Sequence, residues 1–237
     1  MHSDGEEFRL EAENFDLRRL LAQAGIDAAE HEVAHRLQRI LVGELHHRVK
    51  NILATVQAIV FQSLRVAENV EQGCAAIESR LLALGRVHDL LLQTNWSKTK
   101  FDAILKAAIE PFDTPVARQF QTRTSSIDVA PDAALSLAMV LNELCTNAVK
   151  YGALSSPAGR VEIDASVDGD NKRFLLTWAE KDGPAVQQPT RRSFGSKLIE
   201  HGFVAQLQGK ARLSFEPDGV IYKLDVPLAS LQQQIAN

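Results

Sequence analysis

Cysteine is scarce in this sequence. Among 237 residues there are two, Cys74 and Cys145, and each lies in a stretch with helical spacing. A framework of disulfide bridges, the usual stabiliser of small secreted domains, is therefore excluded. So little cysteine is typical of proteins in a reducing compartment, and we expect a cytoplasmic location.

Long apolar runs and an excess of basic charge are also missing. No apolar run reaches the roughly 18 residues that a helix needs to cross a bilayer, and the N-terminus is too acidic for a secretory signal. We therefore expect no membrane insertion. The net charge of −4 and the isoelectric point of about 6.0 give no electrostatic ground for a nucleic-acid partner. Hydrophobic residues make up 45% of the chain, enough for one large domain or two modest ones.

The first half of the chain has the period of helices. From residue 30 to 65 the apolar residues alternate steps of four and three, as in a coiled-coil seam. A second helical stretch, residues 70–93, follows a short polar connection, which favours an antiparallel hairpin. One hairpin has too little apolar surface to be stable alone, so we expect two copies to pair in a dimeric four-helix bundle. Residues 1–29 also show helical spacing. The seam residues are Leu45, Val49, Ile52, Val56 and Ile59.

After the polar break TNWSKTK the pattern changes to mixed helix and strand. Helices are predicted over 101–112, 131–151 and 195–207, and strands over 125–130, 161–167, 173–180, 211–216 and 220–226. Pro131 opens the second helix, with Asp132 as its predicted N-cap. The expected organisation is a helical segment over 1–29, a dimerising hairpin over 30–97, an α+β domain over 98–230 and a frayed tail over 231–237.

The stretch GELHHRVKNILATVQ, residues 43–57, places two histidines inside the first helix. At about 100° per residue, His47 points about 200° away from the seam residue Leu45 and faces solvent. Glu44 and Asn51 lie one turn to either side of His47, so the three share an exposed face. A carboxylate beside an imidazole can hold one tautomer and accept a proton while the other nitrogen attacks an electrophile. His47 and Glu44 are therefore a candidate nucleophile and base.

Two other interpretations apply to these histidines. Exposed histidines are common on helices, and geometry alone favours solvated surface residues. A metal site is disfavoured, because His46 and His47 project about 100° apart and no other histidine offers a suitable partner. His88 and His201 are expected to be ordinary helix residues.

A second polar cluster lies on the helix predicted over 131–151. Glu143, Asn147 and Lys150 stand at i, i+4 and i+7 and share a face, here called the polar stripe. An amide oxygen can hold hydrated magnesium, a carboxylate can orient or deprotonate a water, and an ammonium can neutralise phosphate. The alternative is a solvated face with one Glu–Lys pair, which spacing alone favours.

Two glycine-containing stretches accompany the polar stripe. Trp178 and Glu180 lie at the end of a predicted strand before a Gly-Pro loop, and SFGSKLIE places Gly195 at the start of a predicted helix. Glycine lets the backbone approach a ligand, and a helix N-terminus attracts phosphate. With the polar stripe, these stretches favour a nucleotide site.

Four motifs together resemble those of the HWE-type sensor histidine kinases of two-component systems. ELHHRVKNILATVQ is similar to that family's phosphoacceptor motif, and NELCTNAVKYGALSSPAGRVEI to its N-box. WAEKDGPAVQQP resembles the first glycine box with its Trp-x-Glu signature, and SFGSKLIE resembles the second. The motifs follow the family's order over about residues 33–228, which makes a chance match improbable.

The resemblance implies a fold and a reaction. Residues 30–97 would be the dimerisation and histidine phosphotransfer domain, and residues 98–230 an α/β sandwich of the Bergerat or GHKL type that binds ATP with Mg²⁺. The expected function is autophosphorylation of His47, with Glu44 accepting its proton. The phosphate would then pass to an aspartate on a response-regulator receiver domain.

The resemblance also assigns residues to the ATP site. Asn147 would be the magnesium ligand and Glu143 the N-box acid. Glu180 would recognise adenine, with Asp182 as its nearby rival. The glycines of the nucleotide loop would be Gly183 and Gly195, whereas Trp178 is expected to be a packing residue.

Three positions depart from the family's pattern. Asn142 stands where the N-box has His, Asp182 where the first glycine box often has Gly, and Ser193 where the second has Gly. Serine restricts a loop that needs glycine's freedom, and asparagine cannot carry a proton as histidine can. A second hypothesis is therefore an ATP-independent histidine phosphotransfer or scaffold protein. A third is a GHKL kinase that phosphorylates serine.

Overall fold

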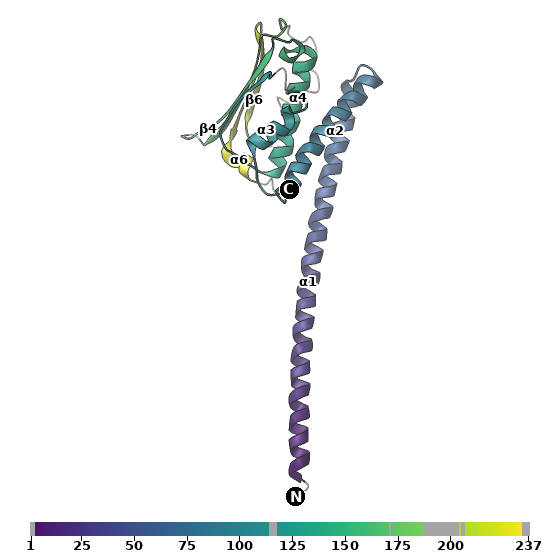
Figure 1. The fold of residues 1–237 in the computed structure, drawn as a ribbon. Coiled ribbons are helices and arrows are strands. Elements are labelled where there is room, and N and C mark those ends of the chain that lie inside the picture. The colour runs from purple at the N-terminus through teal and green to yellow at the C-terminus, as the bar shows by residue number, and fades with distance from the viewer. Residues whose placement is uncertain (1–2, 114–117, 171, 187–203, 205–206, 234–237) are drawn as a thin grey trace. The chain divides into compact units, whose positions relative to one another are not determined.

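The computed structural model describes residues 3–113, 118–170, 172–186, 204 and 207–233. It has two compact units, Met1–Gln57 and Ala58–Asn237, and each is described by itself. The first unit is a stretch of helix. The second contains the end of that helix, a second long helix packed beside it, and a mixed sheet covered by helices (Figure 1).

Helix α1 extends over Ser3–Val66, 64 residues in all. The helices predicted over residues 1–29 and 30–65 are therefore one continuous element. In the first unit many of its described apolar side chains are open to solvent, and Leu41, Leu45 and Val49 are each more than half exposed. No described helix, α1 included, has an apolar stretch long enough to cross a membrane.

Helix α2, Val70–Gln93, confirms the helix predicted over 70–93. Asn69 caps it, because its side-chain oxygen accepts a hydrogen bond from the backbone N–H of Gln72 at 2.8 Å. Gly73 allows close packing against α1, since a Cβ at this position would lie 3.1 Å from Leu64 Cδ2. The short connection and these contacts support the predicted hairpin.

Five strands form a mixed sheet in the order β2-β4-β5-β7-β6. Neighbouring strands are antiparallel, except that β2 and β4 are parallel. The β4–β5 and β6–β7 pairs confirm the two hairpins predicted from the sequence. A small second sheet pairs β1 with β3. The strands are β1 (Thr99–Lys100), β2 (Phe120–Thr124), β3 (Asp128–Val129), β4 (Arg160–Asp168), β5 (Arg173–Lys181), β6 (Lys210–Glu216) and β7 (Gly219–Pro227).

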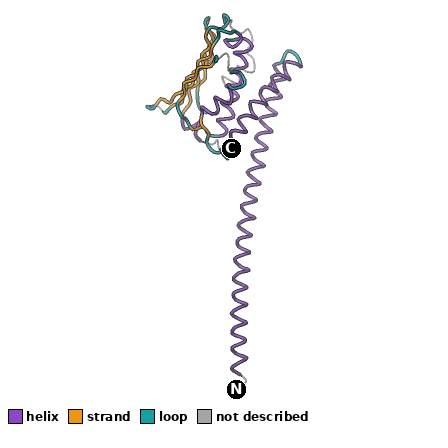
Figure 2. Tube along the Cα trace, in the orientation of Figure 1, coloured by secondary structure: helices purple, strands orange, loops and turns teal. Residues whose placement is uncertain are grey.

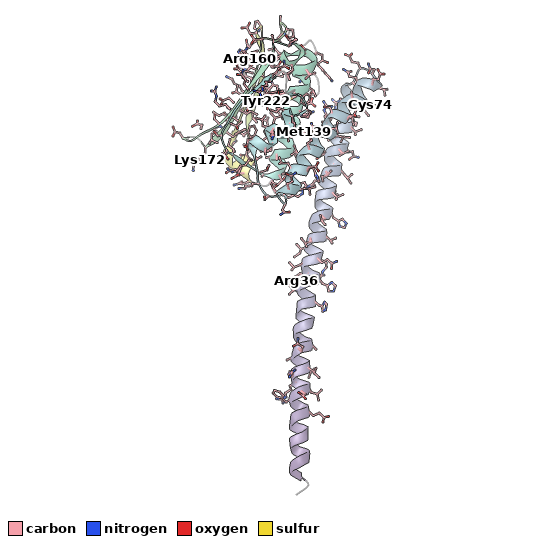
Figure 3. All side chains as sticks on the ribbon, in the orientation of Figure 1. Arg36, Cys74, Met139, Arg160, Lys172 and Tyr222 are labelled. Carbon is pink, nitrogen blue, oxygen red and sulfur yellow. The ribbon has the colours of Figure 1, made fainter. Side chains whose placement is uncertain are left out.

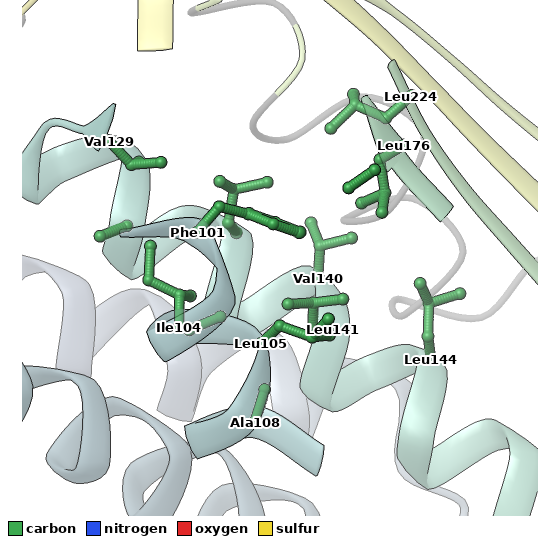
Figure 4. Packing of buried hydrophobic residues seen from close by; sticks show 14 of the residues in the cluster. Phe101, Ile104, Leu105, Ala108, Val129, Val140, Leu141, Leu144, Leu176 and Leu224 are labelled. Atoms are coloured by element: carbon green, nitrogen blue, oxygen red, sulfur yellow. The ribbon is translucent and has the colours of Figure 1, made fainter. Parts of the chain in front are cut away.

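Helices α3 (Phe101–Ile109) and α4 (Pro131–Tyr151) cover one face of the five-stranded sheet (Figures 1 and 2). Alternate residues of β4 and β5 are buried beneath them, as the period of two requires. The rings of Phe101 and Phe174 meet edge to face with centroids 5.1 Å apart. Figure 4 shows residues of both helices and of the sheet in this core. The packing confirms the predicted α+β domain.

The second half of α2 belongs to the same core. Val87 and Leu91 are fully buried within it, and Trp96 packs against it. His88, expected to be an ordinary helix residue, lies edge-on to Trp96 with ring centroids 5.1 Å apart. The end of the hairpin is thus anchored in the α+β core by apolar contacts, and the domain boundary near residue 98 stays a prediction.

Two local predictions were wrong. Ala130, not Asp132, is the N-cap of α4, because Pro131 takes the first helical position, where its missing N–H is harmless. Of the strand predicted over 125–130 only Asp128–Val129 forms one (β3), and β2 just before it was missed because only Phe120, its first residue, is even half-buried. Of the helix predicted over 195–207, only Val204 and Leu207 lie within the described residues, and both are buried.

The C-terminal segment was predicted to be a frayed tail, and its first residues are ordered instead. Helix α6 extends over Leu228–Gln232, and Leu231 is fully buried in the core. The carbonyl of Leu231 also accepts a hydrogen bond from Ala130 N–H at 2.8 Å, next to the start of α4. Residues 234–237 lie outside the described part of the chain.

Replacing Leu231 therefore tests this correction. Leu231→Ala is expected to lower the free energy of unfolding by about 2–4 kcal/mol, because it removes a buried side chain and leaves a cavity. Chemical denaturation measures the change. Gln233→Ala, at an exposed position, should change stability by less than about 0.5 kcal/mol. Equal stability of the two variants would restore the frayed-tail interpretation.

Candidate active site

The histidine stretch is helical, as predicted, because residues 43–57 lie within α1. His46, Lys50 and Asn51 are exposed on it. The side chains of Glu44 and His47 lie outside the described part of the structure. Their roles as base and phosphoacceptor stay predictions.

The polar stripe of α4 lines one cavity in the second unit. Glu143, Asn147 and Lys150 all contribute to its wall, and its volume is about 350 Å³. The facing wall comes from the end of α1 and the first half of α2, including Gln72 and Ser79. The predicted shared face therefore exists, and the helical hairpin forms the other wall of its cavity.

The three residues of the stripe differ in exposure. Glu143 is only 5% exposed, Asn147 is half-buried, and Lys150 is exposed. Magnesium in proteins keeps several waters and takes one or two protein oxygens together with substrate phosphates. The single amide oxygen of Asn147 fits this pattern, with Lys150 one turn away for the phosphate charge. Among the described residues, no group of three or more acidic, histidine or cysteine side chains is arranged to hold a metal by itself.

Glu143 is bound by an arginine that the sequence analysis missed. Arg80 Nε lies 2.6 Å from Glu143 Oε1, and Arg80 Nη2 lies 3.0 Å from Oε2. Arg80 Nη1 also donates to the hydroxyl of Ser63 at the end of α1. The sequence did contain a signal for Arg80, because this charged residue stands on the apolar face of α2, three residues after Ile77 and four before Leu84.

Asn142, which replaces the family's histidine, makes a weaker contact next to this ion pair. Its side chain is 1% exposed, and its Nδ2 donates to Ser79 Oγ at 3.3 Å. Its Oδ1 has no hydrogen-bond partner in the described part of the chain. A buried polar atom left unpaired costs about 1–3 kcal/mol, so this position does not strengthen the contact between α2 and α4.

Glu180 lies at the end of β5, beneath the loop that follows α4. Its carboxylate accepts hydrogen bonds from Ala153 N–H at 2.8 Å and from the indole N–H of Trp178 at 3.3 Å. Burial raises the pKa of Glu180, and these two hydrogen bonds lower it in part. The absence of a side chain at Gly152 leaves room for this carboxylate, because a Cβ there would lie 1.9 Å from Glu180 Oε2. Gly152 is a second residue that the sequence analysis missed.

The glycine-box loop leaves β5 through two constrained positions. Asp182 has φ of 55°, the left-handed region that favours glycine, so a non-glycine residue is strained there. Asp182 also pairs with Arg160, which Figure 3 labels on the sheet. Gly183 is needed for packing, since a Cβ there would lie 2.6 Å from the Cα of Ala153. Gly195 and Ser193 lie outside the described residues.

The close approach at Gly183 gives a stability prediction. Gly183→Ala is expected to lower the free energy of unfolding by about 1–3 kcal/mol, because the added methyl group meets backbone atoms. Gly169→Ala is the matched control, since a Cβ at Gly169 meets no atom within 4 Å. Denaturation of both variants measures the difference. A Gly183→Ala protein as stable as the control would show that this loop does not pack on Ala153.

The sequence matches a known family. Residues 44–125 match the model of the HWE histidine kinase family. The blue-light-activated histidine kinase of Brucella anthropi is 36% identical over 208 residues, which cover 86% of this chain and 42% of that protein. The protein of the same name from Brucella abortus is 34% identical over 204 residues, 85% of this chain and 42% of its own length. The chain therefore spans less than half the length of these relatives.

A solved structure shares the fold. The histidine kinase domain of the Erythrobacter litoralis EL346 blue-light activated histidine kinase superposes with a TM-score of 0.58 at 19% identity. The match covers 78% of this chain and 88% of that domain. Family model, relatives and fold agree with the four motifs in the sequence, and the chain belongs to the HWE-type sensor histidine kinase family.

Proposed function

We propose that this chain is an ATP-dependent protein histidine kinase that phosphorylates itself on His47. The observation that carries the proposal is the polar stripe, whose three members line one cavity on a helix that shares its apolar core with a mixed sheet. Carboxylate, amide and ammonium groups in that order suit phosphate and its metal better than they suit an apolar ligand. Membership of a histidine kinase family supports this reaction class.

The chemistry assigned to these residues is phosphoryl transfer. A nitrogen of His47 attacks the γ-phosphorus of ATP, the bond from that phosphorus to the bridging oxygen breaks, and ADP leaves with the electron pair. Glu44, one turn away, accepts the proton from the imidazole. Bound Mg²⁺ neutralises phosphate charge. Asn147 would hold that ion and Lys150 would contact the phosphates.

The remaining residues would bind the nucleotide. Glu180 is the candidate adenine-recognition residue, and Asp182 is its rival at the loop. The loop through Gly183 and Gly195 would lie along the phosphates. Glu143 would be the N-box acid, although Arg80 engages both of its oxygens in this structure.

Exposed apolar side chains support a homodimer as part of the proposal. On a single chain these side chains stay in contact with water. Covering them with a partner helix would remove apolar surface from water and stabilise the helix. Two hairpins packed as a four-helix bundle would cover them. The exposed residues on the hairpin helices include Leu45, Val49, Leu53, Phe61, Leu64 and Leu82. The phosphate would pass from this dimer to an aspartate of a response-regulator receiver domain in the cytoplasm.

One observation favours the alternative of an ATP-independent phosphotransfer or scaffold protein. The N-box acid is occupied by Arg80, and its neighbour Asn142 carries an unpaired buried oxygen in place of the family's histidine. A protein that has lost ATP chemistry would retain the dimer and His47. Under this alternative His47 is phosphorylated only by a phosphorylated partner.

Phosphate incorporation tests the proposed function. Purified chain incubated with γ-labelled ATP and Mg²⁺ is expected to take up acid-labile, alkali-stable label. His47→Ala should abolish the label, and the matched variant His46→Ala should retain it, because His46 projects about 100° from His47. Label lost only in His46→Ala would contradict the site, acid-stable label would indicate a serine kinase, and no label in a folded wild type would favour the alternative.

A further inference from the structure

The contact between α2 and α4 has two parts of different chemistry. Near the end of α2, Val87 and Leu91 are buried in the apolar core together with residues of α3 and α4. Two to three turns earlier, the contact consists of the Arg80–Glu143 ion pair and the Ser79–Asn142 hydrogen bond. The apolar part resembles a permanent anchor, and the polar part does not.

The polar part, here called the latch, ties three helices together. Arg80 of α2 reaches Glu143 of α4 through two nitrogens and Ser63 of α1 through the third. The Arg80 and Glu143 side chains are only 8% and 6% exposed. Each of the two charges is therefore buried, and its partner in the ion pair is what compensates it there.

A latch of this kind adds specificity more than stability. Removing two charges from water costs about as much as their attraction returns, so a buried ion pair contributes little net stability. The unpaired Oδ1 of Asn142 makes the same interface weaker still. Since the apolar anchor lies at the other end of α2, the latch can open without disrupting the core.

Opening the latch would affect the polar stripe. Both carboxylate oxygens of Glu143 accept hydrogen bonds from Arg80 and the side chain is only 6% exposed, so the intact pair directs the carboxylate to the guanidinium and leaves little of it open to water. The cavity beside it, about 350 Å³, is at the lower end of the roughly 300–1,000 Å³ typical of small-molecule sites. Separation of the first half of α2 from α4 would free the carboxylate and widen the cavity along Asn147 and Lys150.

We propose that the Arg80–Glu143 ion pair is an autoinhibitory latch, which holds the N-box acid against the helical hairpin and must open before Mg-ATP is used. The inference rests on the proposed kinase function. Arg80 acts here as a regulatory residue that controls Glu143 and does not itself contact the reacting atoms. Glu143 then has two states, paired with Arg80 when the kinase is off and directed to the nucleotide when it is on.

Two variants of α2 test the latch by rate. Arg80→Gln removes the charge that holds Glu143, and its initial rate of autophosphorylation should rise about fivefold or more, the lower end of ordinary coupling between two states. Arg86→Gln is the matched control. Arg86 lies on the same helix and donates to the carbonyl of Ala107 at 3.1 Å, without contact to the stripe acid. Its rate should equal that of the wild type.

A distance measurement tests the latch without any phosphorylation. Cys74 is exposed near the start of α2 (Figure 3), whereas Cys145 is buried, so a spin label attaches at Cys74 and at an introduced Thr122→Cys on exposed β2. The doubly labelled chain is mixed with an excess of unlabelled chain, so that only distances within one protomer are measured, and one population is expected with Arg80 present. With Arg80→Gln added, a second and longer population should appear.

The two readouts separate the latch from the kinase. A longer population without phosphorylation in any variant would sustain the latch and overturn the proposed function. An unchanged distance distribution in folded Arg80→Gln would overturn the latch, whatever the kinase activity. A lower or unchanged rate in a folded Arg80→Gln protein would make Arg80 a static anchor and overturn the latch. If Arg80→Gln unfolds, the double variant Arg80→Gln with Glu143→Gln leaves no unpaired buried charge and is used for the distance test instead.

Discussion

The buried ion pair between Arg80 of α2 and Glu143 of α4 joins two residues that lie 63 positions apart in the sequence. It fixes which side of α4 faces the hairpin, because Glu143 can reach the guanidinium from only one face of its helix. The other side of α4 packs into the apolar core through fully buried Leu137 and Leu141. Removing one partner of such a pair destabilises a protein by far more than the intact pair stabilises it, because a buried charge is left unpaired. The contact therefore specifies how α2 and α4 are arranged, which the apolar core alone would not.

The position of α4 determines the geometry of the candidate site. With its apolar side on the sheet, the helical period brings Asn147 and Lys150 to the cavity wall beside Glu143. At the end of α4 the chain turns over β5, and the close approach at Gly152 allows Glu180 to bind the N–H of Ala153. The acid of the stripe and the acid of the glycine box therefore end in two different environments, one paired with arginine and one held by neutral donors.

Periodicity and turn chemistry predicted most of the fold from the sequence. The helices over 70–93 and 131–151 and the two C-terminal hairpins have strong local patterns, since each buries one face against the core. Strand β2 has no such pattern, because it lies at the sheet edge with four of its five residues exposed. Leu231 was misplaced because its burial depends on the distant core, and its carbonyl binds Ala130 N–H, 101 residues earlier in the chain.

The residues of the site were predictable in kind and less so in arrangement. The spacing of Glu143, Asn147 and Lys150 gave their shared face, because helix geometry alone determines it. No local rule pairs Arg80 with Glu143, since the contact depends on how two distant helices cross. The positive φ of Asp182 and the packing of Gly183 supply physical reasons for a glycine box that the sequence showed only as a motif.

Magnesium-dependent nucleotide binding tests the central claim most directly. Calorimetric titration of the full chain with ATP, with and without Mg²⁺, should show binding that strengthens with the metal. Asn147→Ala should weaken the magnesium-dependent part at least about tenfold and leave the metal-free part unchanged. ATP binding that is absent from the folded wild type, or that is equal with and without Mg²⁺ in both proteins, would contradict the assignment of the polar stripe as the site of a histidine kinase.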